Sequence, residues 1–451
     1  MVGKYQPYPE YRASGAQWLG EIPLNWNLFD GKRLFENRRE LSIGTDEQLA
    51  ASQKYGVIPQ SLMMKLNASK VMLALKGTSS FRHVGKDDFV ISLRSFEGGI
   101  EHSNYVGCVS PAYTVLVATK DTAASFYRYL FKSQPYIAAL QSSTDSLRDG
   151  KSITFDQFGA IPLVLPMLNE QQKIANFLDH ETAKIDTLIE KQQQLIKLLE
   201  EKRQAVISHA VTKGLNPNAL MRDSGVEWLG EVPEHWNISK VKYLAELTPK
   251  KTEVEALKNK TCSFIPMEKL KKDLLILDET RQISQVFDGY TYFKDEDLLV
   301  AKVTPCFENK NMVVARGLHN GVGFGSSEIY VLRPNLESLN DFLYYRLQED
   351  ILMEMATGAM TGAGGLKRVP SVFLNNVQLA LPPMKERLEI VEYIRGYVSK
   401  FDNLMKNSEY VIKLMQERRT ALISAAVTGK IDVRNWQALQ PSNKSNNNTG
   451  K

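Results

Sequence analysis

Two long stretches of the chain have the spacing of apolar residues that a long α-helix needs. In the first, residues 169–214, no proline occurs and a glycine, Gly214, ends the run. Apolar residues recur there in alternating steps of three and four, which is a heptad spacing. The same ladder returns 216 positions later, over residues 385–430, so that Ile174 corresponds to Ile390. The pattern predicts two matching helices, each roughly 60 Å long at about 1.5 Å per residue.

The ladder also predicts how the helices pack. Its apolar rungs are Ile174, Leu178, Ile185, Leu188, Leu195, Leu199 and Val206 in the first stretch, and Ile390, Ile394, Tyr397, Phe401, Leu404, Val411, Met415 and Leu422 in the second. Polar rungs stand at matched heights, Gln192 with Ser408 and Lys202 with Arg418. In coiled coils, polar seam residues set the register at a cost in stability. We predict a two-helix coiled coil that separates the two halves of the chain. The alternative, in which each helix packs only on its own domain, fits their length less well.

Each half of the chain also begins and ends with a repeated segment. Residues 14–26 (SGAQWLGEIPLNW) return as residues 224–236 (SGVEWLGEVPEHW), with eight of the thirteen positions identical. Residues 201–212 (EKRQAVISHAVT) return as residues 417–428 (ERRTALISAAVT). The first pair is offset by 210 positions and the second by 216, so the length difference falls between them. The repeated segments form two matching frames, and the sequences that they enclose, the inserts, have diverged. This arrangement indicates a protein that recognises two different ligands or sites with one common geometry.

The inserts, residues 27–166 and 237–382, have the pattern of mixed α/β domains. Strand-like runs occur at residues 70–75, 89–93, 113–117, 297–301 and 329–332, and short helices fit residues 123–131 and 339–356. Each insert ends with a Gly/Ser/Thr-rich loop that carries basic residues, at 142–151 and 357–368, followed by a strand and a proline. Small side chains and free N–H groups let such a loop approach a phosphate backbone. An ordinary solvated loop is the alternative.

Composition limits the class of protein. Of the 451 residues, 43% are hydrophobic and 24% charged, which is typical of a globular protein long enough for two or three cored domains. The formal net charge of +5 is compatible with an anionic partner without requiring one. The cysteines, Cys108, Cys262 and Cys306, are widely spaced and odd in number, which argues against a disulfide framework or a zinc site. No run of residues is apolar enough to span a membrane, and we expect a cytoplasmic protein.

Motifs for catalysis are weak in this sequence. An adenine methyltransferase needs an Asp/Asn-Pro-Pro-aromatic motif to hold the base, whereas the Pro-Pro pair here stands in LPPM at residues 381–384. A phosphate-binding G-x-x-x-x-G-K-[ST] loop is missing, and the glycines at 321, 323 and 325 precede no helical pattern. Glu308-Asn309-Lys310, downstream of Asp297, matches the acidic-x-Lys triplet of metal-dependent nucleases, but so short a triplet arises by chance. His83, His102 and His209 lack metal-ligand spacing, and we expect structural or surface roles for them.

Together, the repeated motifs resemble those of the specificity subunits of type I restriction-modification enzymes. The resemblance rests on the Trp-Leu-Gly-Glu-Ile/Val-Pro segments, the Pro-x-x-x-Glu-Gln/Arg entries to the long helices at 166–171 and 382–387, and the Arg-x-Ala-[VL]-Ile-Ser-x-Ala-Val-Thr endings. It covers almost the whole chain. Arg387 departs from the usual Glu-Gln that Gln171 retains, and the first copy ends Thr-Lys-Gly where the second ends Thr-Gly-Lys.

The resemblance implies a fold, an activity and partners. The fold is α+β, with two target recognition domains separated by an antiparallel coiled coil. Its expected divisions are residues 1–168, the central helix 169–214, residues 215–384, the C-terminal helix 385–430 and a polar, disordered tail 431–451. The subunit is expected to bind double-stranded DNA at a bipartite asymmetric target. Two modification (methyltransferase) subunits and two restriction subunits would join it. S-adenosylmethionine, ATP and magnesium would belong to those partners, so the chain itself is expected to have no cofactor and no catalytic or metal site. The alternatives are a coiled-coil adaptor that does not touch DNA and a DNA enzyme with an unrecognised active site.

Candidate DNA contacts are basic, amide and hydroxyl side chains in the inserts. Arg and Lys can donate to guanine, Asn can read adenine, and hydroxyls and Lys commonly hold phosphates. The candidates are Lys76, Thr78, Ser79, Arg82, Arg94, Arg148 and Lys151 in the first insert, and Lys302, Thr304, Asn309, Lys310, Asn311, Lys367 and Arg368 in the second. Lys151 and Lys367 coincide at the offset of 216.

Overall fold

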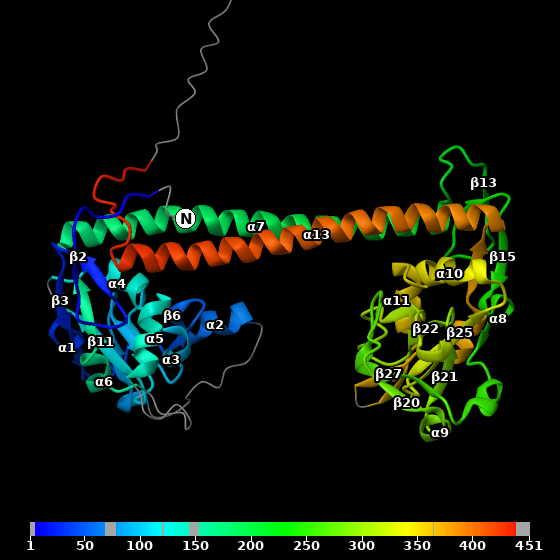
Figure 1. Cartoon of the computed structure of the whole chain (residues 1–451), viewed down its shortest axis with the longest axis horizontal. Coiled ribbons are helices and arrows are strands. Elements are labelled where there is room, and N and C mark those ends of the chain that lie inside the picture. The colour runs from blue at the N-terminus through cyan, green and yellow to red at the C-terminus, as the bar shows by residue number, and fades with distance from the viewer. Residues whose placement is uncertain (1–4, 68–77, 120, 144–152, 364, 439–451) are drawn as a thin grey trace, which may run out of the picture. The chain divides into compact units, whose positions relative to one another are not determined.

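The computed structural model describes residues 5–67, 78–119, 121–143, 153–363 and 365–438. The chain forms two compact units: unit 1 is Met1–Gln193 with Glu409–Lys451, and unit 2 is Gln194–Ser408. Each unit contains one insert together with part of each long helix (Figure 1). The strand expected at residues 70–75 and most of the loop expected at 142–151 lie outside the described residues.

The long helices are α7 (Leu168–Lys213) and α13 (Met384–Val427), each beginning one residue earlier than predicted. In unit 1, the first half of α7 lies beside the end of α13, and Arg419 Nε donates to Asp186 Oδ1 at 2.8 Å. In unit 2, the end of α7 lies beside the first half of α13, with Arg203 Nε 3.3 Å from Asp402 Oδ1. The helices are therefore antiparallel within each unit (Figure 1), which confirms the predicted helix pairing.

The predicted ladder needs one correction, because four of its rungs lie on the surface. The exposed rungs are Leu188 (47% exposed), Leu195 (42%), Tyr397 (38%) and Leu404 (51%). Their apolar neighbours Ile189, Ile196, Val398 and Met405 are half-buried instead, as are the rungs Val206, Phe401, Val411 and Met415, whereas Ile174, Leu178, Ile185, Leu199, Ile390, Ile394 and Leu422 are buried. Two adjacent apolar residues stand at each mistaken rung, so a heptad spacing fits either residue and the sequence pattern cannot choose between them.

The polar rungs shift in the same way. Ser408 is buried and Gln192 is half-buried, as the ladder requires. Lys202 and Arg418 are exposed, and the inward positions belong to the neighbouring Arg203 and Arg419, which make the two inter-helix ion pairs.

Unit 1 builds its insert around an antiparallel sheet of order β4-β11-β8-β9. Its strands are β1 (Tyr11–Ala13), β2 (Glu21–Pro23), β3 (Asn27–Asp30), β4 (Phe35–Arg38), β5 (Leu49–Ser52), β6 (Gly56–Pro59), β7 (Arg82–Val84), β8 (Phe89–Ile91), β9 (Glu101–His102), β10 (Gly107–Val109), β11 (Thr114–Ala118) and β12 (Pro162–Leu165). Its shorter helices are α1 (Gly31–Leu34), α2 (Gln60–Asn67), α3 (Ser95–Gly98), α4 (Ala124–Leu130), α5 (Gln134–Ser142) and α6 (Phe155–Gly159). Pairing of β3 with β12 brings the two ends of the insert together.

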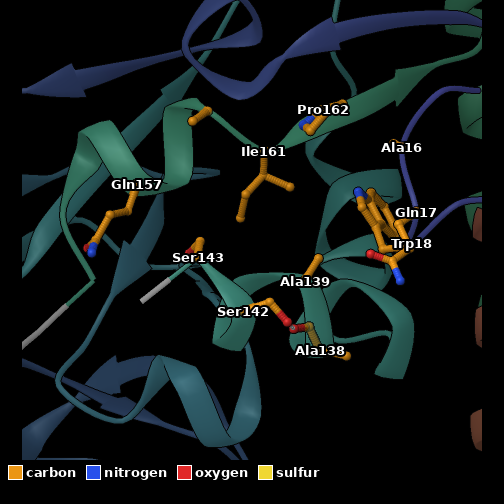
Figure 2. A pocket seen from close by; sticks show the side chains of 11 residues that line it. Ala16, Gln17, Trp18, Ala138, Ala139, Ser142, Ser143, Gln157, Ile161 and Pro162 are labelled. Carbon is orange, nitrogen blue, oxygen red and sulfur yellow. Dashed lines mark hydrogen bonds between the residues drawn. The ribbon is translucent and has the colours of Figure 1, made fainter. Parts of the chain in front are cut away.

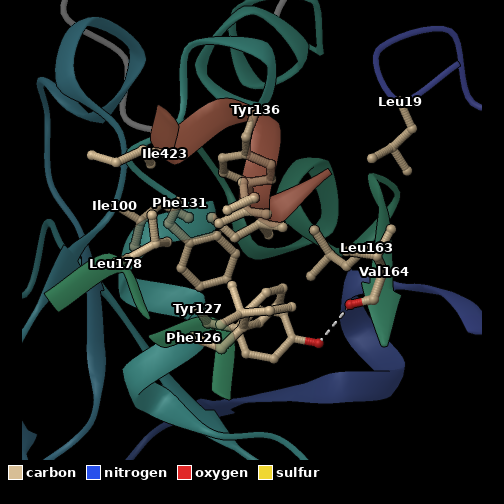
Figure 3. Close-up of a cluster of buried hydrophobic side chains, with 14 of the residues drawn as sticks. Leu19, Ile100, Phe126, Tyr127, Phe131, Tyr136, Leu163, Val164, Leu178 and Ile423 are labelled. Atoms are coloured by element: carbon tan, nitrogen blue, oxygen red, sulfur yellow. Dashed lines mark hydrogen bonds between the residues drawn. The ribbon is translucent and has the colours of Figure 1, made fainter. Parts of the chain in front are cut away.

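An aromatic core joins this insert to the long helices. Phe126 and Tyr127 of α4 are fully buried, and the Tyr127 hydroxyl donates to the Val164 carbonyl at 2.9 Å. Leu178 of α7 and Ile423 of α13 belong to the same hydrophobic cluster (Figure 3). Burial of such side chains contributes about 1.5–3 kcal/mol each, so the insert is anchored on the helix pair of its own unit.

Unit 2 repeats this plan and adds a second sheet. Its strands are β13 (Met221–Asp223), β14 (Glu231–Pro233), β15 (Asn237–Lys240), β16 (Ala245–Leu247), β17 (Thr261–Ile265), β18 (Leu270–Lys271), β19 (Leu274–Leu275), β20 (Thr280–Gln282), β21 (Thr291–Lys294), β22 (Leu298–Ala301), β23 (Met312–Val314), β24 (Val322–Gly325), β25 (Ile329–Pro334), β26 (Thr361–Ala363), β27 (Leu366–Arg368) and β28 (Gln378–Leu381). Its shorter helices are α8 (Val241–Leu244), α9 (Ile283–Val286), α10 (Asn340–Leu347), α11 (Asp350–Gly358) and α12 (Ser371–Asn376). The sheet β16-β25-β22-β23 is the counterpart of the unit 1 sheet, and β20-β17-β24-β21 is the additional one.

Two predicted segments of unit 2 differ from the structure. The helix expected over residues 339–356 is two helices, α10 and α11, separated at Gln348, whose carbonyl accepts from the Gln204 and Lys310 side chains. The loop expected at residues 357–368 is the end of α11 followed by the hairpin β26–β27, in which Gly362 and Gly365 have positive φ.

The polar tail begins later than expected. Ile431 and Val433 are buried. The Trp436 ring packs edge-on against the Phe177 ring, with the ring centroids 5.4 Å apart. These apolar contacts order residues 431–436 in spite of the polar residues around them. Residues 439–451 lie outside the described residues.

The repeated Trp-Leu-Gly segments form equivalent frames in the two units. Arg12 Nη2 donates to the Trp26 carbonyl at 2.7 Å, and Arg222 Nη2 donates to the Trp236 carbonyl at the same distance. A glutamate in the first turn of each long helix then accepts from the tryptophan indole, Glu170 from Trp26 at 2.9 Å and Glu386 from Trp236 at 3.1 Å. The repeat therefore fixes where each long helix begins relative to its insert.

Candidate nucleic-acid interface

In unit 2, an exposed β-hairpin brings four of the predicted DNA contacts together. Thr304 is joined to the β26–β27 hairpin by three hydrogen bonds: its N–H donates to the Lys367 carbonyl at 2.9 Å, its hydroxyl donates to the Gly365 carbonyl at 2.8 Å, and the Lys367 N–H donates to that hydroxyl at 3.0 Å. The Val369 N–H donates to the Lys302 carbonyl at 2.9 Å. Lys302, Thr304, Lys367 and Arg368 therefore lie in one small region.

These cations differ in how far they are already neutralised. Arg368 makes two hydrogen bonds of 2.8 Å to the Glu328 carboxylate, and these lower the pKa of Glu328 and keep it charged. The Lys302 ammonium lies 5.2 Å from the centroid of the Tyr330 ring. Lys367 is exposed, and among the described residues no carboxylate lies within ion-pair distance of it. Lys367 is therefore the cation of this region that is most available to an incoming phosphate.

The three neighbouring candidates are placed differently from one another. The Lys310 ammonium donates to Asp350 at 2.6 Å and to the Gln348 carbonyl at 2.7 Å, so it holds α11 in place. Asn311 is half-buried, and its carbonyl accepts from the Ala301 N–H at 2.9 Å. Asn309 is exposed with its side chain available, so it is the amide of this group that can meet a base edge.

One surface residue of the hairpin was missed by the sequence reasoning. Leu366 is 55% exposed beside Lys367 and Arg368. All seven described residues from Thr361 to Arg368 are exposed. A two-stranded ribbon of this kind can enter a DNA groove. The two glycines that precede Leu366 in the sequence, at 364 and 365, were the available signal for a tight turn.

In unit 1, the predicted contacts that the structure describes are more dispersed. Thr78 and Ser79 lie in a short 3₁₀ turn, and the Thr78 carbonyl accepts from the Ser42 hydroxyl at 2.5 Å. Arg82, on β7, donates to the Arg39 carbonyl at 3.1 Å, which places Arg39, an exposed cation not predicted from the sequence, next to it. Arg94 is exposed and paired with Glu97 at 2.5 Å. Lys76, Arg148 and Lys151 lie outside the described residues.

The histidines and the possible nuclease triplet have other partners. His83 contacts Asp46 at 2.8 Å and His102 contacts Asp87 at 3.0 Å, and burial lowers the pKa of His102. The buried Asp297 carboxylate accepts two hydrogen bonds of 2.7 Å from Arg333, which leaves it committed to that ion pair. Within the part of the chain that the structure describes, no group of three or more His, Cys, Asp or Glu residues is arranged to hold a metal ion.

A groove of about 460 Å³ lies between the repeated segment and the insert of unit 1 (Figure 2). Ala16, Gln17 and Trp18 form one side of it, and residues of α5 and α6 form the other. The described lining consists of alanines, serines, glutamines, a tryptophan, an isoleucine and a proline, with no titratable side chain. Such a lining offers no acid and base pair, so the groove is not a catalytic site of the usual kind.

Considering the described residues alone, none of the helices has the length and apolar character required to cross a membrane.

Comparison with known proteins finds a matching domain and similar subunits. Residues 23–198 match the type I restriction modification DNA specificity domain. The EcoEI specificity subunit of Escherichia coli is 32% identical over 219 residues, which are 48% of this chain but only 36% of that subunit, so the match spans about a third of the relative's length. The StySPI specificity subunit of Salmonella potsdam is 21% identical over 404 residues, covering 87% of this chain and 81% of that one.

Solved structures agree on the fold. The HsdS subunit from Thermoanaerobacter tengcongensis superposes with a TM-score of 0.53 at 16% identity, over 91% of this chain and 98% of that one. A chain from a study of complex assembly and conformational transition in the type I R-M system superposes with a TM-score of 0.65 at 15% identity, over 91% and 99% of the two chains. Taken together, residues 23–198 match the type I restriction modification DNA specificity domain, and the chain as a whole shares its fold with the HsdS subunit and is similar to type I specificity subunits.

Proposed function

We propose that this chain is the DNA-recognition subunit of a type I restriction-modification complex, and that it reads a bipartite, asymmetric DNA target. The observation that carries the proposal is the repeat of one frame around two different inserts, which presents two unlike surfaces on one scaffold. Residues 361–368, which form the exposed ribbon β26–β27, share only Lys367 with the corresponding residues 145–152, where it is Lys151, so the two inserts would read different half-sites. A protein that read one sequence twice would need no such divergence.

Partner subunits would supply the chemistry. We propose that two modification subunits and two restriction subunits join this chain, bringing S-adenosylmethionine, ATP and magnesium for adenine methylation and DNA cleavage. The ion pair between Asp297 and Arg333 supports the proposal that catalysis belongs to the partners. Arg333 occupies the Asp297 carboxylate, which a metal-dependent nuclease would need as a metal ligand.

Exposed apolar side chains on the long helices support partner docking. In unit 1 they include Leu188, Tyr410 and Leu414, and in unit 2 they include Leu195, Leu198, Tyr393, Tyr397 and Leu404. Tyr393 and Tyr397 lie with ring centroids 4.7 Å apart. Exposed apolar residues grouped in this way mark interaction sites in soluble proteins. The rungs that left the predicted seam are thus part of the surface that a methyltransferase subunit would cover.

A non-binding coiled-coil adaptor is the weaker alternative. It accounts for α7 and α13 but assigns no role to two inserts whose surfaces have diverged. Unpaired Lys367 and the exposed ribbon favour a polyanionic ligand over a purely structural role.

The test is methylome sequencing of DNA from cells that express this chain with its modification subunit. We expect one methylated adenine motif composed of two unlike half-sites separated by unread base pairs. Replacing residues 27–166 with the corresponding region of another specificity subunit should change one half-site alone. Loss of both half-sites in a chimera that still assembles, or robust methyl transfer or cleavage by the purified chain without partners, would contradict the proposal.

A further inference from the structure

The two units dock their inserts on the long helices through equivalent positions that carry different chemistry. In unit 1, α4 packs on the start of α7, and in unit 2, α10 packs on the start of α13. The offset of 216 aligns α4 with α10 and α7 with α13, so Gln171 corresponds to Arg387 and Asp179 to Arg395. We call the contacts of these four residues with the inserts the docking seams.

In the unit 1 seam, the buried Gln171 amide makes three hydrogen bonds: one to the start of α4 and two to the carbonyls of neighbouring loops. Gln171 is fully buried, and its Oε1 accepts from the Ala123 N–H at 2.8 Å at the start of α4. Its Nε2 donates to the Asp121 carbonyl at 3.0 Å and the Pro166 carbonyl at 2.9 Å. The Ala123 N–H is one of the orphan donors at a helix start, which need an acceptor when they are buried. Only a side chain that both accepts and donates can make these three bonds.

At the equivalent place in unit 2, Arg387 is 5% exposed and acts purely as a donor. Its Nη2 donates to the Ser338 hydroxyl at 3.3 Å, and its Nε is buried without a partner. Burial lowers the pKa of this guanidinium. An arginine has no acceptor atom, so it cannot replace Gln171 beneath Ala123.

The second seam position reverses its charge between the units. In unit 1 the acid is on the long helix: Asp179 pairs with Arg128 of α4, and the Tyr129 hydroxyl donates to it at 2.5 Å. In unit 2 the acid is on the insert: Asp341 of α10 accepts from Arg395 of α13 at 2.6 Å and from Arg316 at 2.8 Å. An insert moved onto the other helix would therefore bring like charges together.

We infer that the docking seams match the first insert to the first long helix, so that the two inserts are not exchangeable between the first and second positions of the chain. An insert from position one placed in position two would bring Arg128 toward Arg395 and would leave the Ala123 N–H facing Arg387. The buried amide position carries most of the discrimination, because the Arg128 and Asp179 side chains are 34% and 46% exposed and such pairs contribute little.

The first test uses single substitutions in the full chain and hydrogen exchange read peptide by peptide. Gln171→Arg should speed exchange over residues 122–130 at least tenfold, because Ala123 loses its acceptor, and should leave residues 338–347 unchanged. The matched substitution Arg387→Gln should change exchange over residues 338–347 less than threefold, since glutamine can still donate to Ser338. Equal effects of the two substitutions, or no effect of Gln171→Arg, would overturn the inference.

The second test asks whether the mismatch can be repaired. In a full chain whose residues 237–382 are replaced by a second copy of residues 27–166, the pair Arg387→Gln and Arg395→Asp should raise the melting temperature by several degrees. The same pair in the unaltered chain should lower the melting temperature, because Arg395→Asp places a carboxylate against Asp341. A pair that fails to raise the melting temperature of the chimera, or that raises it equally in both chains, would overturn the inference. Should the chimera not fold in either form, the hydrogen-exchange result on the unaltered chain decides.

Discussion

Removing the Glu170 carboxylate should loosen the N-terminal segment from the start of α7. Glu170 is 6% exposed and accepts hydrogen bonds from the Tyr8 hydroxyl at 2.6 Å, the Trp26 indole at 2.9 Å and the Asn25 amide at 3.2 Å. Burial and the nearby carboxylate raise the pKa of Tyr8, so its hydroxyl remains a donor over the working pH range. The carboxylate also lies in the first turn of α7, where the helix dipole favours negative charge.

The magnitude follows from the groups left behind. Tyr8 and Trp26 are 3% and 1% exposed, and a buried donor without a partner costs about 1–3 kcal/mol. Water can enter part of the vacated space, so we expect Glu170→Ala to destabilise this segment by about 3 kcal/mol. Glu170→Gln keeps one acceptor oxygen and loses the charge, for which we expect about 1 kcal/mol.

Glu386→Ala is the matched control in unit 2. Glu386 accepts from one buried donor, the Trp236 indole at 3.1 Å, and its other partner, His235, is 51% exposed. We therefore expect a smaller loss in unit 2, of about 1 kcal/mol, and no change in unit 1.

Hydrogen exchange of residues 5–26 measures the effect, because these residues should open locally before the whole unit unfolds. A loss of about 3 kcal/mol corresponds to exchange about 100-fold faster. Exchange in Glu170→Ala within twofold of the unaltered chain would refute the reasoning, as would an equal response of residues 5–26 to Glu386→Ala.

Three further predictions concern binding, assembly and spacing. Lys367→Ala should weaken binding to specific and non-specific DNA alike, and it should reduce the dependence of the binding constant on salt concentration by about one counterion. The control Lys385→Ala removes a 91% exposed lysine at the start of α13 and should change neither quantity. An altered methylation motif with an unchanged salt dependence would make Lys367 a base reader. A chain truncated after residue 222 should dimerise and direct its modification subunit to an inverted repeat. The reason is that Ile207, Ala210 and Val211 of a second copy can replace Ile423, Ala426 and Val427 in the unit 1 core. A monomer by light scattering, or a methylated motif that is not palindromic, would contradict this. Inserting four residues after Gln192 adds about 6 Å of helix and should lengthen the unread gap or abolish methylation; an unchanged gap with full activity would show that the helices do not set the distance.

Local patterns were enough to predict the frame of this protein. The absence of proline and the heptad spacing predicted α7 and α13 to within three residues at either end, because a helix of this length is specified by its own repeating contacts. Strands such as β22 and β25 were predicted because they are short, apolar runs in the sheet core. The repeats, and the family they resemble, were likewise legible in residues 14–26 and 224–236.

The choice between adjacent side chains depended on the tertiary structure. Leu188 and Ile189 are equally apolar, and only the packing of each helix against its partner and its insert decides which of them is buried. The candidate DNA contacts show the same limit. Sequence grouped Lys310 with Lys367 as basic loop residues, but Lys310 meets Asp350, which lies 40 residues away in the chain, while Lys367 stays exposed on a hairpin.

The docking seams show the difference most clearly. Sequence marked Arg387 as a departure from the usual Glu-Gln, and its matching to an insert became visible once the fold brought Ser338 to it and Ala123 to Gln171. The sequence by itself determined the two helices, the repeat and the division into inserts, because these depend on residues close together along the chain. The tertiary structure alone decided which cations are free, which rungs are buried and which insert fits which helix, because each of these depends on hydrogen bonds and burial between residues about 40 or more positions apart.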